Sequence, residues 1–248
     1  MRSLLGFDLV ALGMFLNSAS PTRSDAVMQT IRGLLVAGNE KLSQQAFHFD
    51  LPAGLTCPGK SGLCMSRCYA RKGRFAFPQV QERLNWCYEQ SKRDDFADRL
   101  VDELYRKGVL LMRWHCAGDI YCPAYARKML DVMVRSPHTS FWCYTRSWRV
   151  PTISLILKEL SLVPNMKLWL SADAETGYPD EVPENARVAW MQTSVDEDVG
   201  DSDLVFLDHP LRKLTLPLHV LEKACPTETP EGKKKGTTCA TCRYCWTE

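Results

Sequence analysis

The chain has 248 residues, of which 45% are apolar and 24% are charged, and its formal net charge is +2. These values are typical of a globular protein, and the length suits one large domain such as an α/β barrel or two small ones. The small net charge gives no indication of nucleic-acid binding, and no stretch has the roughly 20 apolar residues that span a bilayer.

Eleven cysteines are many for a cytoplasmic chain and an odd number for a secreted disulfide scaffold. The N-terminal sequence "MRSLLGFDLVALGMFLNSAS" has some features of a signal peptide, but Asp8 interrupts its apolar part. We therefore expect a cytoplasmic protein whose clustered cysteines bind metal or take part in chemistry.

The first third of the chain predicts a helix over residues 24–38 and then a short strand in "AFHFDL" at 46–51, where apolar and polar residues alternate. A long loop rich in glycine and cysteine follows this strand. Two further helices are predicted, around 78–91 and 94–107, the second with apolar residues at helical spacing.

From residue 109 onward, apolar runs of strand length recur at 109–116, 139–146, 166–173, 187–193 and 203–209. Helical patterns follow the first two of these runs, each with a proline near its start. Strands that alternate with helices predict a parallel sheet, and about six strands predict an α/β fold of the partial (βα)6 TIM-like barrel type. We expect this barrel, with an N-terminal helical lead-in, over residues 1–220, and a cysteine-rich tail packed on it over 221–248.

The tail contains Cys225, followed by proline, and the run Cys239, Cys242 and Cys245 in "CATCRYC". A single zinc ion is usually bound by two separate Cys-x-x-Cys hairpins. Three cysteines in successive steps of three instead resemble the runs that surround an iron–sulfur cluster, where a Cys-Pro often completes the set. The tail therefore favours a [4Fe-4S] cluster, with structural zinc as the alternative.

A second group, Cys57, Cys64 and Cys68, lies on the loop after the first predicted strand. In parallel α/β proteins, ligands bind at the carboxyl ends of strands, where this loop should lie. Three ligands predict a cluster with one open iron, unless Cys116 supplies a fourth ligand or the site holds zinc. The spacing also allows one mixed cluster that draws on both groups.

Polar residues at the ends of the other strands are candidates for the same site. Gly118 and Asp119 combine a flexible backbone with a carboxylate that could receive an ammonium group, although Asp119 could instead cap a helix. His115 is a candidate acid or base, or a packing residue. Arg113, expected to point the same way as His115, could bind a carboxylate or phosphate. Tyr144 and Ser171 are candidate pocket walls.

The segments "NEKLSQQAFHFDLPAGLTCPGKSGLCMSRCYARKG", "RWHCAGDIYCPAY", "FWCYTRSW" and "CATCRYCW" resemble a family of phage-encoded cysteine-rich proteins. That family is similar in turn to radical S-adenosylmethionine (SAM) enzymes. This resemblance implies a partial barrel of about six βα units with a three-cysteine loop after strand one. It also implies that Gly118 and Asp119 bind the methionine amino group and that Tyr69 is the aromatic residue beside a cluster cysteine. The loop spacing here is C-x6-C-x3-C, whereas that superfamily typically has C-x3-C-x2-C.

Three functions remain open from the sequence. The first is a radical SAM-like enzyme with one or two [4Fe-4S] clusters, SAM, a small-molecule substrate and an electron donor. The second is a SAM-independent iron–sulfur hydrolase or lyase, with the open iron as Lewis acid and Asp119 or His115 as acid–base partner. The third is a non-catalytic electron-transfer or structural metal protein. No membrane partner is expected, and nucleic acid is not indicated.

Overall fold

The computed structural model describes residues 32–247, and from Leu34 on they form one compact unit. Most of the helix predicted over 24–38, and with it the helical lead-in, lies outside the described residues. Within them, strand β1 (Val36–Ala37) pairs antiparallel with β2 (Phe47–Phe49). The helix prediction is therefore wrong at its C-terminal end, where pairing with a neighbouring strand outweighs a local helical pattern.

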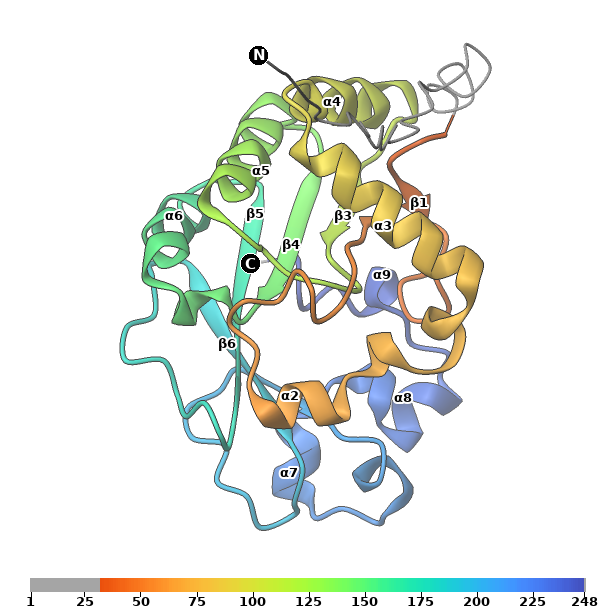
Figure 1. Cartoon of the computed structure of the whole chain (residues 1–248). Coiled ribbons are helices and arrows are strands. Elements are labelled where there is room, and N and C mark those ends of the chain that lie inside the picture. Colours follow the sequence, from red (N-terminus) through yellow and green to blue (C-terminus); the bar gives the residue numbers. More distant parts are fainter. Residues whose placement is uncertain (1–31, 248) are drawn as a thin grey trace, which may run out of the picture. The chain divides into compact units, whose positions relative to one another are not determined.

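This unit is built on one seven-stranded sheet in the order β1 to β7 (Figure 1). Every pair from β2 to β7 is parallel, and the sheet is not closed into a barrel. The remaining strands are β3 (Leu111–Trp114), β4 (Ser140–Thr145), β5 (Met166–Asp173), β6 (Ala186–Gln192) and β7 (Leu204–Leu207). The six parallel strands are the six that the sequence predicts.

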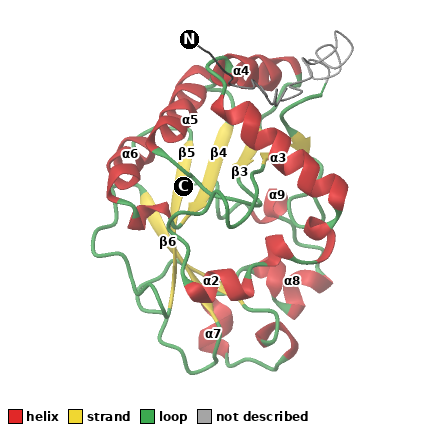
Figure 2. Cartoon of the chain, in the orientation of Figure 1, coloured by secondary structure: helices red, strands yellow, loops and turns green. Residues whose placement is uncertain are grey.

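Helices connect only the first parallel strands (Figure 2). Between β2 and β3 lie α2 (Gly62–Arg67), α3 (Pro78–Lys92) and α4 (Phe96–Arg106), and the next two connections contain α5 (Pro123–Arg135) and α6 (Pro151–Ser161). In the described chain, residues 174–185 and 193–203 contain no helix. The chain therefore does not form a regular series of six βα units. Its fold is an open α/β sheet.

The two faces of the sheet bury different partners because side chains alternate along each strand. On β4, Phe141 and Cys143 pack into the large core under α4, α5 and α6, which follow one another along this side in Figure 1. Trp142 and Tyr144 point the other way, toward a second core. We call these the helix-covered and tail-covered faces.

The tail-covered face is closed by the end of the chain from Cys225 on. This segment forms a 3-10 turn (Pro226–Glu228), α8 (Pro230–Lys234) and α9 (Cys239–Cys242). Buried cysteines of this segment pack in one cluster with Trp142 and Trp169 of the sheet. The helix before this segment, α7 (Leu218–Lys223), instead packs Val220 into a third cluster with Val188 and Trp190 of β6. In the chain from Arg32 to Thr247, no helix combines the length and apolar character that a membrane crossing requires.

Candidate functional site

The loop that carries Cys57, Cys64 and Cys68 follows β2 at the carboxyl edge of the sheet, and all three thiols are half-buried. Burial is the largest effect on the Cys57 thiol and raises its pKa to about 12, and the Asp119 carboxylate adds to the rise. The charges of Cys64 and Cys68 also raise the pKa of Cys57. The three predicted ligands of the first site are thus close enough to act on one another.

The loop is clamped by the residues that end β5. Ser61 accepts a hydrogen bond from the Cys64 backbone N–H at 2.8 Å and donates one to Asp173 Oδ2, also at 2.8 Å. The Glu175 carboxylate accepts hydrogen bonds from two backbone N–H groups at the start of α2, those of Gly62 and Leu63. The backbone that carries Cys64 is therefore fixed to the sheet.

Two glycines allow this loop to lie against its neighbours. A Cβ on Gly59 would lie 1.9 Å from the Arg146 carbonyl oxygen, so no side chain fits between the loop and the end of β4. Gly118 has φ +80°, and a Cβ there would lie 2.6 Å from both Leu51 Cβ and Thr56 Oγ1. Glycine is required at both positions for the loop to approach the ends of β3 and β4.

Asp119 lies at this edge and is buried, as expected for a site residue at the end of β3. Its Oδ1 accepts hydrogen bonds from the Ile120 N–H and the Thr145 hydroxyl, and its Oδ2 accepts one from the Arg146 N–H. Burial raises the pKa of Asp119, and these hydrogen bonds oppose the rise. The carboxylate at the end of β3 is thus held by backbone and side-chain donors of the segment that ends β4.

The four predicted tail ligands line a single small pocket. Cys225, Cys239, Cys242 and Cys245 form it together with the side chains of neighbouring tail residues and Leu204. Burial raises the pKa of the Cys245 thiol to about 12, and the charges of Cys225 and Cys239 contribute to the rise. The remote Cys225 and the run of three are therefore brought together by the fold.

The distances between the thiols can be compared with those that one metal ion requires. Tetrahedral zinc with Zn–S bonds of about 2.3 Å would bring its sulfur ligands to about 3.8 Å from one another. Among the described residues, the only group of three or more His, Cys, Asp or Glu side chains with ligand atoms all within 4.8 Å is His48, Asp50 and Cys116. Neither cysteine site therefore has three thiols that all lie within 4.8 Å of one another.

Backbone hydrogen bonds seat the tail cysteines on the sheet. Cys225 donates its N–H to the Val205 carbonyl at 2.8 Å, and Cys239 donates to the Lys41 carbonyl at 2.8 Å. Trp169 donates its indole N–H to the Cys245 carbonyl at 2.9 Å. The pocket is thus supported by β5, β7 and the segment before β2.

Arg113 does not belong to the first site. Its guanidinium lies 5.2 Å from the centre of the Tyr144 ring on the tail-covered face. Burial lowers the pKa of Arg113, but the nearby charges of Cys116, Tyr69 and Cys239 outweigh this effect and raise it. Within the described chain, its guanidinium makes no ion pair with a carboxylate. It is a buried cation beside the tail thiols.

His115 points the other way, so the expectation that it shares a direction with Arg113 is wrong. Its φ of +62° interrupts the alternation that would have placed positions 113 and 115 on one face. The imidazole Nε2 lies 2.8 Å from the Tyr125 hydroxyl in the helix-covered core, and burial lowers the pKa of His115 to about 4. His115 is a neutral packing residue, as the alternative interpretation of the sequence allowed.

The remaining candidates are divided between the two sites. Tyr144 lies beside Cys245 in the tail site, and it packs against Trp169 and Phe206. Tyr69 follows Cys68 and is 60% exposed as a whole residue, while its hydroxyl donates a hydrogen bond to the Cys116 carbonyl. Ser171 is half-buried near the end of β5, and its carbonyl accepts a hydrogen bond from Trp148.

Sequence reasoning missed the importance of His48 and Asp50. The signal was present: both are polar, they alternate on a strand around the buried Phe49, and the strand leads into the cysteine loop. In the structure they meet Cys116 at the end of β3. Lys41 and Glu228 were missed as well, and they form an ion pair of 3.0 Å next to the tail site.

Comparison with known proteins gives the family. The family model described as "Gene product 88" matches residues 27–248. The chain belongs to this family. The "Gene 88 protein" of Mycobacterium phage L5 is 28% identical over 210 residues, which cover 77% of this chain and 78% of the relative. That of Mycobacterium phage D29 is 27% identical over 207 residues, with the same coverage.

The matches confirm the predicted resemblance to phage-encoded proteins. No solved structure matches the chain. The similarity to radical SAM enzymes stays a prediction.

Proposed function

We propose that this chain is an iron–sulfur enzyme of the radical SAM type, in which Cys57, Cys64 and Cys68 hold a [4Fe-4S] cluster with one open iron. The observation that carries the proposal is the gathering of three half-buried thiols at the carboxyl edge of a parallel sheet. Three protein ligands leave the open position that a reactive metal site needs.

When bound, such a cluster supplies an electron and an iron that can take the amino and carboxylate groups of SAM. The chain's own part is to position the ligand and exclude water. The Asp119 carboxylate at this edge suits an N–H of that amino group, and Gly118 lets the backbone approach it. Tyr69, whose surface as a residue is largely exposed, lies beside the third cysteine.

The second cluster, on Cys225, Cys239, Cys242 and Cys245, has a full set of protein thiols. A site with no open position suits electron transfer or structural support. Buried Arg113 and the Lys41 ammonium lie near Cys239, and their positive charges would offset the negative charge of a thiolate-bound cluster. This is the observation that favours the electron-transfer or structural alternative for the tail.

The SAM-independent hydrolase or lyase has less support. Of its two proposed acid–base partners, His115 is neutral, hydrogen-bonded to Tyr125 and directed into the helix-covered core. Only Asp119 remains at the edge where the open iron would lie.

The proposal is tested by preparing the chain without oxygen and measuring iron and sulfide per chain. We expect about eight irons, as two four-iron clusters require. Cys64→Ser should reduce this to about four, Cys242→Ser should do the same, and Cys122→Ser, outside both sites, should leave it unchanged. Formation of 5′-deoxyadenosine from SAM should then depend on reductant and be lost in Cys64→Ser. Full cluster loading without any 5′-deoxyadenosine would reject the radical SAM assignment.

A further inference from the structure

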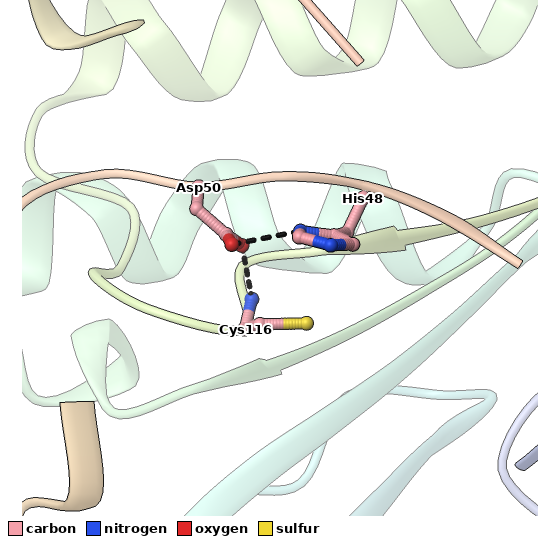
Figure 3. Close-up of side chains that lie close together, drawn as sticks. All are labelled: His48, Asp50 and Cys116. Carbon is pink, nitrogen blue, oxygen red and sulfur yellow. Dashed lines mark hydrogen bonds and ion pairs between the residues drawn. The ribbon is translucent and has the colours of Figure 1, made fainter. Parts of the chain in front are cut away.

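His48, Asp50 and Cys116 form a compact group outside both cysteine sites. His48 lies on β2, Asp50 follows β2, and Cys116 follows β3, which pairs with β2. All three side chains are buried, and one ligand atom of each lies within 4.8 Å of the others. Figure 3 shows the imidazole beside the Asp50 carboxylate, with the Cys116 sulfur on the same side of the carboxylate as the ring.

His48 and Asp50 form a buried ion pair, in which His48 Nδ1 lies 2.7 Å from Asp50 Oδ2. The positive charge of this pair is the proton on the ring, and a metal ion that binds Nδ1 would replace that proton. A buried imidazole that faces a carboxylate and a thiol has the ligand types that surround a cation of the zinc class.

The surroundings hold the group in place. Asp50 Oδ1 accepts hydrogen bonds from the backbone N–H groups of Cys116 at 2.6 Å and Ala117 at 3.4 Å, so Oδ2 is left to face His48. Asn39 Nδ2 lies 3.9 Å from the Cys116 sulfur. Hydrogen bonds from the protein to ligand side chains are the usual second layer of a metal site.

We propose that His48, Asp50 and Cys116 bind one divalent transition-metal ion of the zinc class. Imidazole, carboxylate and thiolate are all ligands of zinc, and three protein ligands leave a fourth position open. Two anionic ligands balance a dication, which permits its burial. The ligand atoms lie closer together than the thiols of either cysteine site, so the two kinds of site should take different metals.

The proposal does not depend on iron–sulfur chemistry, and zinc can be counted separately from iron. The full chain is first loaded with iron and sulfide without oxygen, then incubated with zinc chloride and desalted. We expect about one zinc per chain in the wild type and in His138→Ala, whose imidazole is exposed and distant in sequence. His48→Ala and Cys116→Ser should lose this zinc and keep their iron.

The zinc affinity of His48→Ala and Cys116→Ser should fall by more than roughly 100-fold. A loss of up to about that size is typical when a residue that only hydrogen-bonds to a metal ligand is changed. Unchanged zinc in both variants, or a wild type that binds no zinc, would overturn the proposal.

A measurement on the wild type tests the same site without relying on variants, which could lose zinc because they fail to fold. X-ray absorption at the zinc edge should show one sulfur and at least two nitrogen or oxygen neighbours. Four sulfur neighbours would place the zinc in the tail pocket instead and would equally reject the site at His48, Asp50 and Cys116.

Discussion

Arg146 Nη1 lies 2.7 Å from Asp173 Oδ2, and both side chains are buried at the carboxyl edge of the sheet. The same Asp173 oxygen accepts the hydrogen bond from Ser61, which caps the helix that carries Cys64. This ion pair therefore joins the ends of β4 and β5 to the cysteine loop. The positive charge of Arg146 also lowers the pKa of Cys64 against the larger opposing effect of burial.

Removal of the Asp173 charge should loosen the first cysteine site selectively. Asp173→Asn leaves the Arg146 guanidinium buried without its anion, which should reduce the free energy of unfolding by about 3–5 kcal/mol. Urea unfolding measures this loss, and iron analysis should show depletion at the first site alone. Asp180→Asn, an exposed change in the same connection, is the control. Equal stability of the two variants would show that the ion pair does not support the loop.

Gly118→Ala should be more damaging than the same change at another glycine with positive φ. Gly73 has φ +56°, and a Cβ added there would meet no atom within 4 Å, so Gly73→Ala should cost only about 1 kcal/mol of backbone strain. Gly118→Ala adds contacts of 2.6 Å to Leu51 and Thr56 and should cost more than about 2 kcal/mol. Thermal unfolding compares the two variants. Equal losses would mean that the loop does not pack closely on residue 118.

Trp169→Phe should weaken attachment of the tail. The indole N–H is the donor to the Cys245 carbonyl, and its loss should cost about 1–2 kcal/mol. Limited proteolysis should then cleave the tail faster. Trp148→Phe removes an equivalent 2.8 Å bond to the Ser171 carbonyl, away from the tail, and should leave tail cleavage unchanged. Equal protection in both variants would contradict the role given to Trp169.

Low pH should break the hydrogen bonds between the Glu175 carboxylate and the first backbone N–H groups of α2. Hydrogen bonds from the backbone N–H groups of Gly62 and Leu63 lower the pKa of Glu175 below its ordinary 4.5. Because the folded-state pKa is lowered, this contact is present above pH 4.5 and is lost as the pH falls through the folded-state value. Hydrogen exchange of the two amides should accelerate in that range. In Glu175→Gln, exchange should already be faster at neutral pH, and an unchanged rate there would contradict the assignment.

The sequence predicted all six parallel strands, because β2 alternates apolar and polar residues and the other five are short apolar runs, as in β4 with Phe141, Trp142 and Cys143. It also predicted α3 and α4, and it predicted α5 and α6 with a proline near the start of each. It did not predict β1, whose two residues are too few to show a pattern. The regular βα repeat failed because two connections, 174–185 and 193–203, form no helix.

The gathering of the four tail cysteines around one pocket could be predicted from the sequence, but the direction in which single side chains point could not. Arg113 and His115 are two apart and should share a face, yet the left-handed φ of His115 separates them. Nothing local in "RWHC" signals that turn. Similarly, the meeting of Asp50 with Cys116 depends on strand pairing between residues 66 positions apart.

The proposed function depends above all on an iron–sulfur cluster with an open iron at Cys57, Cys64 and Cys68. The decisive experiment is low-temperature electron spin resonance of the reduced, oxygen-free Cys242→Ser variant, in which only the first site should hold a cluster. We expect a cluster signal that changes shape when SAM is added. A colourless chain without this signal, binding only zinc, would refute the cluster.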